Sequence, residues 1–266
     1  MGSESVIWNS ILVLGGIGLG CGTLLLVASR FFAVSIDERV EKLIQLLPGA
    51  NCGACGFAGC AQYAKELIGG HATSDACRVM DVEKAKSVAS LLGAEVAVGD
   101  RKKAVLQCQG GMGVARQWAE WIGLNSCRAA SLYFHGNKEC AYACLGFGDC
   151  VAVCPFQAIS RREDGLVAID PEKCTGCGLC VAECPKGMIL LVPEKAQVVV
   201  ACLSKDRGKR VSQICKKGCI ACRRCEKACP VNAIVVEENL ARIQYEICDN
   251  CGLCVEACPT KSIIRR

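Results

Sequence analysis

The N-terminal stretch is apolar over a length that suits a membrane. From Val6 to Ala28, 23 consecutive residues carry no charge, and as a helix they would extend about 35 Å, enough to cross the hydrocarbon core of a bilayer. A cleaved signal peptide is the alternative, but residues 1–5 lack Lys and Arg and no clean cleavage site follows. We therefore predict an uncleaved transmembrane anchor over residues 1–30.

Charges and glycines around this span suggest its orientation and its neighbours. Arg30, Arg39 and Lys42 follow the span and Glu4 precedes it, so the positive-inside rule places the bulk of the chain on the cytoplasmic side of the cell membrane. That compartment is reducing, so its cysteines stay thiols. The span also contains two Gly-x-x-x-Gly pairs, which would let another membrane helix approach closely. The alternative is that glycine is simply common in spanning helices.

The next region, residues 31–100, has a helical pattern. Ser35-Ile-Asp-Glu38 is a capping box, and the apolar positions Val40, Leu43 and Leu47 after it repeat at helical spacing up to Pro48-Gly49. A second short helix is expected over residues 61–68. We predict a small helical domain here.

Residues 101–266 contain short strand-like runs separated by cysteine-rich loops. Ala158-Ile159 and residues 233–236 each follow a Cys-Pro pair, which predicts small hairpins. We expect an α+β protein with two modules, residues 101–201 and 202–266, behind the anchor and the helical domain.

The amino-acid composition indicates a metalloprotein. Cysteine supplies 25 of 266 residues, about 9%, but the length, the odd number and the reducing compartment exclude a disulfide scaffold. There are only two histidines, His71 and His135, which argues against bis-His haem and repeated Cys₂His₂ zinc fingers. We expect both to be surface or structural residues. The net charge of +5 does not by itself call for nucleic acid, and what remains is a thiolate-rich metalloprotein.

The helical domain holds one set of four cysteines. Cys52, Cys55 and Cys60 are separated by glycines that allow tight turns, and Cys77 follows a short helix. This pattern predicts a [4Fe–4S] cluster, cluster 1, although four thiolates also suit a zinc ion.

The modules contain four versions of the bacterial ferredoxin run Cys-x₂-Cys-x₂-Cys-x₃-Cys-Pro, one of them expanded around Gly146 and Gly148. We therefore predict that both modules are ferredoxin-like, each with two [4Fe–4S] clusters. In such pairs three thiolates hold one cluster and the fourth, before proline, reaches the neighbouring cluster. The predicted sets are Cys140, Cys144, Cys150 and Cys184 (cluster 2); Cys174, Cys177, Cys180 and Cys154 (cluster 3); Cys219, Cys222, Cys225 and Cys258 (cluster 4); and Cys248, Cys251, Cys254 and Cys229 (cluster 5).

Five cysteines lie outside these sets. Cys21 is within the span, where it is most simply a small apolar residue. Cys108 and Cys127 precede the first module's run, as Cys202 and Cys215 precede the second's. This duplication predicts either a sixth cluster built from all four or four free thiols.

At this point the chain resembles a known family. The run Leu46-Leu-Pro-Gly-Ala-Asn-Cys-Gly-Ala-Cys-Gly-Phe-Ala-Gly-Cys60 behind one anchor, then Cys144-Leu-Gly-Phe-Gly-Asp-Cys150 and serial ferredoxin runs, is similar to the B subunit of the Rnf-type ion-translocating ferredoxin:NAD⁺ oxidoreductase complex. The resemblance covers essentially the whole chain. The shortest family members carry one ferredoxin pair, whereas this chain carries two.

The resemblance implies an electron-transfer subunit of a translocase. It would accept electrons from reduced soluble ferredoxin and relay them through five [4Fe–4S] clusters, with a sixth possible, toward membrane and flavin-bearing subunits. Ion translocation and NAD⁺ reduction would be coupled to this transfer. We find no acid–base or nucleophilic constellation and predict no catalytic residues. The expected partners are those subunits, ferredoxin and membrane lipid, but no nucleic acid.

Alternatives from other classes remain at this stage. A corrinoid-type iron–sulfur protein or another polyferredoxin carrier shares the motifs. A cluster scaffold would release its clusters, and a zinc-ribbon binding protein would be colourless, whereas clusters make a protein brown. Basic clusters at residues 101–103, 205–210, 216–217 and 223–224 are either solvated surface or a docking face for acidic ferredoxin.

Overall fold

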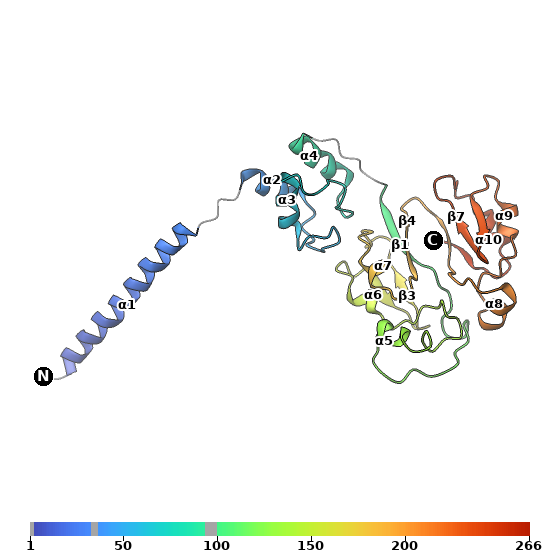
Figure 1. The fold of residues 1–266 in the computed structure, drawn as a ribbon, viewed down its shortest axis with the longest axis horizontal. Helices are drawn as coiled ribbons and strands as arrows, with labels where there is room; N and C mark the ends of the chain where they lie inside the picture. The colour runs from blue at the N-terminus through green and yellow to red at the C-terminus, as the bar shows by residue number, and fades with distance from the viewer. Residues whose placement is uncertain (1–2, 33–36, 94–99) are drawn as a thin grey trace. The chain divides into compact units, whose positions relative to one another are not determined.

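The computed structural model describes residues 3–32, 37–93 and 100–266, in two compact units, 1–43 and 44–266 (Figure 1). The first unit contains α1 (Ser3–Phe31), in which Ile7–Phe31 has a mean hydropathy of 2.3 and is long and apolar enough to cross a membrane. Its large apolar side chains are exposed. These features fit the predicted anchor.

Three helices follow, of which the sequence predicts the first two. They are α2 (Glu38–Leu46), α3 (Cys60–Ile68) and α4 (Val82–Leu92). Tyr63 and Val88 on the last two are fully buried, and α4 ends at Gly93, whose left-handed conformation suits glycine. Ser35 of the predicted capping box and the last residues of the predicted 31–100 domain, 94–99, lie outside the described residues.

The rest of the chain repeats one topology twice. The first copy comprises β1 (Lys102–Leu106), α5 (Cys127–Ser131), α6 (Asp149–Ala152), β2 (Ile159–Arg161), β3 (Val167–Ile169), α7 (Leu179–Glu183) and β4 (Ile189–Pro193). The second comprises β5 (Val198–Val200), α8 (Gly208–Ile214), α9 (Arg224–Ala228), β6 (Ile234–Glu237), β7 (Leu240–Ile243), α10 (Leu253–Ala257) and β8 (Ile263–Arg265).

Each copy pairs its strands in the same antiparallel way. The first strand pairs with the last, β1 with β4 and β5 with β8, and the two middle strands form a hairpin, β2 with β3 and β6 with β7. Lys102 is opposite Pro193, and Val198 is opposite Arg265. The α+β class and the tandem modules are therefore confirmed. Because β5 pairs with β8, the strand before Cys202 belongs to the second module, so the change of module falls a few residues before the predicted boundary at 201/202.

Apolar side chains join the two modules. Val105, Val192 and Val199 form a buried cluster with Ala196, packed against Tyr245 and Ile264. Each module also has its own core, which consists largely of cysteines and aliphatic residues from its strands. The join brings the loop after β1 close to the loop after β5.

Candidate metal centres

The helical domain brings three of the cysteines predicted for cluster 1, Cys55, Cys60 and Cys77, toward one another. Cys60 begins α3, and its amide donates to the Asn51 Oδ1 atom at 2.8 Å, which fixes the loop that carries Cys52 and Cys55. Burial raises the pKa of the Cys77 thiol, and the nearby Cys55 and Cys60 thiols raise it further. The return segment is held by the Tyr63 hydroxyl, which donates to the Thr73 carbonyl at 2.8 Å.

The four ferredoxin runs share one local structure. The third cysteine of each run lies in a short helix, α6, α7, α9 or α10, and the residue before that helix has a left-handed backbone conformation. The last cysteine follows the helix, and in three runs the amide four residues later donates to its sulfur, as Met188 does to Cys184, Ala233 to Cys229 and Ser262 to Cys258 at 3.2–3.3 Å. Such bonds favour the thiolate form that binds metal.

In the second module the structure brings together the thiols predicted for one shared cluster. Cys219, Cys222, Cys225 and Cys258 line a single cavity of about 300 Å³. Burial raises the pKa of Cys225 to about 11, and the thiols of the other three contribute. The fourth sulfur thus comes from the distant Cys-Pro turn, as crossed sharing requires.

The cysteines predicted for clusters 3 and 5 lie close enough to raise one another's pKa. Burial raises the pKa of Cys180 to about 12, and Cys177, Cys174 and Cys154 are among the thiols that add to this. Burial likewise raises the pKa of Cys254 to about 11, with contributions from Cys248, Cys251 and Cys229. The neighbours are those predicted for clusters 3 and 5.

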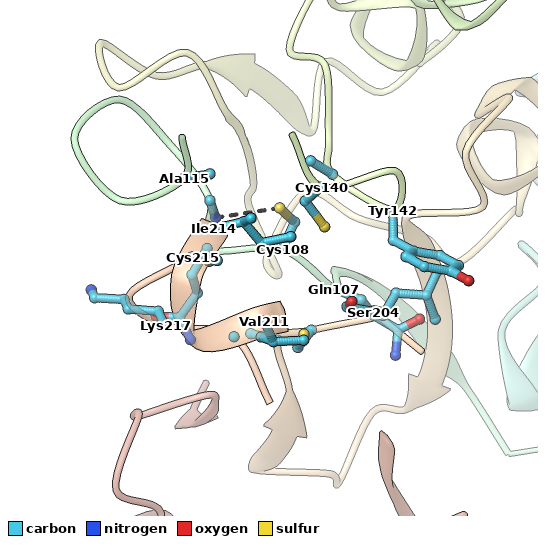
Figure 2. Close-up of a pocket in the computed structure, with 17 residues that line it drawn as sticks. Gln107, Cys108, Ala115, Cys140, Tyr142, Ser204, Val211, Ile214, Cys215 and Lys217 are labelled. Carbon is cyan, nitrogen blue, oxygen red and sulfur yellow. Dashed lines mark hydrogen bonds between the residues drawn. The ribbon is translucent and has the colours of Figure 1, made fainter. Parts of the chain in front are cut away.

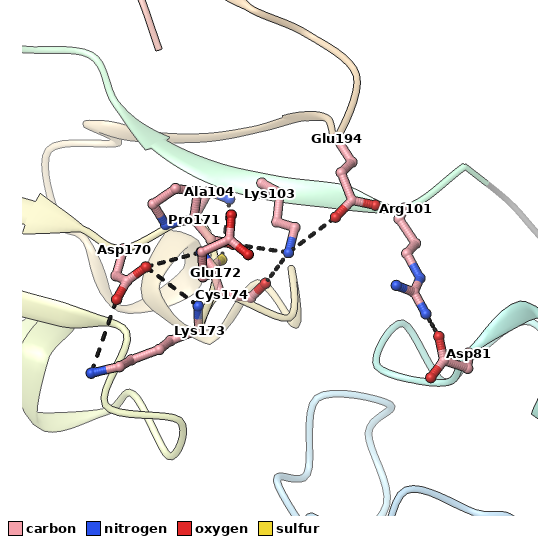
Figure 3. Close-up of polar contacts among 10 residues, drawn as sticks. All are labelled: Asp81, Arg101, Lys103, Ala104, Asp170, Pro171, Glu172, Lys173, Cys174 and Glu194. Atoms are coloured by element: carbon pink, nitrogen blue, oxygen red, sulfur yellow. Dashed lines mark hydrogen bonds and ion pairs between the residues drawn. The ribbon is translucent and has the colours of Figure 1, made fainter.

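A polar anchor fixes the loop of Cys174 against β1. The Lys103 ammonium donates to the carbonyls of Pro171 and Cys174 at 2.9 and 2.8 Å and pairs with Glu194 at 3.1 Å (Figure 3). The next amide, of Ala104, donates to the Cys174 sulfur at 3.4 Å. Lys103 was assigned to a basic surface cluster by sequence, but the structure uses it inside the module.

The first module has a different set of four from the one predicted for cluster 2. Cys127, Cys144, Cys150 and Cys184 line one cavity of about 370 Å³. Burial raises the pKa of Cys150 to about 11, and Cys127 and Cys184 contribute. Cys140, the predicted fourth member, lines another cavity instead.

That other cavity lies where the modules meet. Its volume is about 390 Å³, and its lining includes Cys108, Cys140, Cys202 and Cys215 (Figure 2). Burial raises the pKa of Cys140, with contributions from Cys108 and Cys215, and raises that of Cys202 to about 11, with a contribution from Cys140. Of the predicted sixth set, the structure therefore groups three here and places Cys127 with the other cavity.

Cys127 takes the place predicted for Cys140, and this exchange has a structural cause that sequence spacing does not reveal. The Asp149 carboxylate accepts hydrogen bonds from the Ser126 hydroxyl and the Cys127 amide at 2.9 Å, and from the Arg128 amide at 3.1 Å. Because Asp149 immediately precedes Cys150, these bonds fix Cys127 beside it. The signal in the sequence is the irregular spacing of this run, in which the Cys140–Cys144 and Cys144–Cys150 intervals contain three and five residues instead of two.

A buried lysine, which sequence reasoning missed, lies between these two cavities. Lys138 is 5% exposed, and its ammonium donates to the carbonyls of Gly110 and Cys144 at 2.8 and 2.7 Å. Gly110 lines one cavity and Cys144 the other. In the part of the chain that the structure describes, Lys138 forms no ion pair with a carboxylate.

These cavities fit polynuclear clusters better than single ions. Within residues 3–32, 37–93 and 100–266, no three Cys, His, Asp or Glu side chains converge closely enough to hold one metal ion. The thiols instead line shared cavities in sets of four, the number of ligands that a [4Fe–4S] cluster takes, and a buried cation without a carboxylate partner suits anionic clusters. Neither His71 nor His135 lines the three cavities.

Fold and thiol arrangement together define a multicluster iron–sulfur protein of the ferredoxin type. Residues 138–188 and 218–262 match a family described as a 4Fe-4S dicluster domain, residues 173–234 match another of that description, and residues 47–79 match an Fe-S cluster family. These matches confirm [4Fe–4S] domains.

Three relatives match along most of the chain. The B subunit of the Na(+)-translocating ferredoxin:NAD(+) oxidoreductase complex of Acetobacterium woodii is 46% identical over 90% of this chain and 73% of its own length. The B subunit of the ion-translocating oxidoreductase complex of Methanosarcina acetivorans is 42% identical over 92% and 93%. The proton-translocating counterpart of Clostridium ljungdahlii is 38% identical over 90% and 84%.

The chain therefore belongs to the B-subunit family of ion-translocating oxidoreductase (Rnf) complexes. It is an iron–sulfur electron-transfer protein of such a complex, and the resemblance seen in the sequence is confirmed. The names of the relatives indicate a complex of several subunits, and the apolar α1 helix fits a membrane protein.

Proposed function

We propose that this chain accepts electrons from reduced soluble ferredoxin and relays them toward membrane and flavin-bearing subunits of the complex, where the transfer is coupled to ion translocation and NAD⁺ reduction. The observation that carries this proposal is the series of thiol-lined sites within one chain. Each [4Fe–4S] cluster takes up and releases a single electron. The names of two relatives differ in the ion, sodium or proton, so the proposal covers translocation in general.

The residues of the chain hold and tune these sites. Five sets of four thiols are proposed as ligands: clusters 1, 3, 4 and 5 as predicted, and cluster 2 with the membership argued below. Backbone amides donate to ligand sulfurs, and burial of the sulfurs limits access of water. Both features adjust the tendency of a site to hold an added electron.

We propose that ferredoxin docks on the second module beside Cys222. This cysteine is exposed, unlike most of the others in the modules. Arg224, two residues further along the chain, is also exposed and forms no ion pair in the described part of the chain, whereas Arg223 pairs with Glu226. Two other basic residues of the second module already form ion pairs, Lys205 with Glu238 and Arg210 with Glu139. An exposed positive charge beside an exposed ligand favours an acidic electron donor.

The experiment is stopped-flow reduction of the full chain by reduced ferredoxin, at increasing salt. We expect fast bimolecular reduction that slows as salt rises, and a several-fold lower rate constant for Arg224→Glu at low salt. Lys84→Glu, a matched change at an exposed site on α4, should leave the rate unchanged. Failure of ferredoxin to reduce the chain would overturn the proposed function, and a rate that ignores both salt and Arg224→Glu would overturn the docking site.

The proposal includes the side of the membrane on which the modules lie. Arg30 lies in the last turn of α1, and Arg39 and Lys42 follow, so the modules are proposed to lie on the cytoplasmic side of the cell membrane. Protease added to inside-out vesicles should digest the modules. Digestion only in right-side-out vesicles would contradict this orientation.

A further inference from the structure

We propose that Cys108, Cys140, Cys202 and Cys215 hold a sixth [4Fe–4S] cluster at the contact between the two modules. Because Cys140 then serves the sixth cluster, Cys127 takes its place in cluster 2 with Cys144, Cys150 and Cys184. The inference deepens the proposed function, because the added site joins two modules that would otherwise hold separate pairs of clusters.

The site takes two ligands from each module, and backbone contacts hold the two sides together. Cys108 and Cys140 belong to the first module, Cys202 and Cys215 to the second. Ala115 and Cys215 form an antiparallel β-bridge. The Arg116 amide donates to the Ile214 carbonyl at 2.8 Å, and the Lys216 amide to the Val114 carbonyl at 3.0 Å. The module contact itself therefore places Cys215 opposite Ala115, and Cys215 lines the same cavity as Cys108.

The two strands that precede the site are equivalent by topology. Cys108 follows β1 and Cys202 follows β5, and each of these strands pairs with the last strand of its own module. The duplicated arms thus deliver one thiol each to the same cavity. A repeated element that converges on one point is difficult to explain by packing of unrelated free cysteines.

Amide groups are aimed at the sulfurs of this site as they are at the ferredoxin-type ligands. The Gly110 and Cys144 amides donate to the Cys108 sulfur at 3.3 and 3.5 Å. The Cys219 amide donates to the Cys202 sulfur at 3.3 Å. These bonds stabilise thiolates, which bind iron, more than they stabilise neutral thiols.

The charge of Lys138 supports anions in both cavities. A buried ammonium is costly unless an opposite charge compensates it, and its partners in the structure are two carbonyls. Thiolate-bound clusters on either side would supply that charge. Transfer of a preformed cluster core to the four thiols changes no oxidation state and releases one proton from each thiol.

The test counts iron and sulfide in full-length protein purified anaerobically in detergent. Six clusters predict about 24 iron atoms per chain, and Cys202→Ala predicts about 20. Cys21→Ala is the control and should keep about 24. About 20 irons in the parent chain, with no loss in Cys202→Ala, would overturn the sixth cluster.

Double variants show whether Cys140 or Cys127 belongs to the same cluster as Cys202. If Cys140 and Cys202 serve the same cluster, the Cys140→Ala/Cys202→Ala pair stays near 20 irons, whereas Cys127→Ala/Cys202→Ala falls to about 16 because two clusters are lost. The reverse order of these two values would overturn the exchange of Cys127 and Cys140.

Alkylation of the unmutated chain gives an answer that does not depend on how variants fold. Mass spectrometry after treatment with iodoacetamide should find only Cys21 modified before the clusters are stripped. Modification of Cys108, Cys140, Cys202 and Cys215 under these conditions would overturn the proposal. None of these three experiments uses ferredoxin, so a chain with six clusters that ferredoxin fails to reduce would overturn the proposed function and leave this inference standing.

Discussion

The Ser262 hydroxyl lies 3.2 Å from the sulfur of Cys258, and the Ser262 amide donates to the same sulfur at 3.3 Å. Burial would raise the pKa of Cys258, but these and neighbouring hydrogen bonds hold it below the ordinary value of 9.0. Because a metal-bound thiolate carries no proton, the hydroxyl is the donor. The equivalent position in the first module is Met188, which offers Cys184 its amide alone.

Ser262→Ala should lower the midpoint potential of cluster 4. A hydrogen bond to sulfur stabilises the reduced cluster more than the oxidised one, since reduction adds negative charge. A difference of about 1 kcal/mol corresponds to roughly 40 mV for one electron. Redox titration followed by EPR would measure the shift. Ser212→Ala, at an exposed site on α8, serves as the control, and an equal shift there would refute the assignment.

Lys138→Gln should lower the potentials of the two clusters proposed beside it. The substitution keeps a hydrogen-bond donor but removes a buried positive charge that favours the reduced state, a change on the order of 50 mV. Lys138→Arg keeps the charge and should restore most of the potential. If Gln and Arg behave alike in the titration, the charge of Lys138 has no such role.

Lys103→Met should destabilise the first module. Its ammonium satisfies the carbonyls of Pro171 and Cys174 and pairs with Glu194, and losing these contacts should cost about 2 kcal/mol. That corresponds to a fall of about 4 to 8 °C in the temperature at which the brown colour is lost on anaerobic heating. Lys102→Met, the same change at the exposed neighbouring position, should shift it by under about 2 °C. Similar losses in both variants would contradict the anchoring role.

Gly176→Ala should remove one cluster. Gly176 lies between Cys174 and Cys177 with φ at +70°, and a Cβ atom there would collide with the Lys102 carbonyl. Iron content should drop by about four atoms per chain. Gly187 also has a positive φ of +61° but open space around it, so Gly187→Ala should keep its iron and cost only about 1 kcal/mol. Full iron content in Gly176→Ala would show that the loop tolerates displacement.

Sequence spacing predicts most of the cysteine sets, because three cysteines of each set lie close together in the chain. Three cysteines within seven residues are forced into one loop, and the Cys-Pro turn that follows the helix directs the fourth sulfur to the neighbouring site, as for Cys225 and Cys258. The helices and hairpins around these loops follow from the same short runs. The family was recognisable because several such motifs occur in a fixed order.

The division of Cys127 and Cys140 between two sites could not be predicted in this way. Cys127 precedes the expanded run and Cys140 opens it, and their placement depends on the contact of Asp149 with the Cys127 amide and on the β-bridge at Cys215. These contacts join residues far apart in the chain. Lys138 was missed for the same reason, since burial of a lysine between two thiol-lined cavities has no sequence pattern of its own.

The most direct measurement of the central claim is the number of electrons that one chain accepts. In an anaerobic reductive titration of the full-length protein, with iron and sulfide determined on the same sample, each cluster takes one electron. We predict about six electrons and about 24 irons per chain, each electron bleaching a similar share of the visible absorbance. A colourless protein, or an iron-loaded one that takes up no electrons within the range of ferredoxin potentials, would contradict the account.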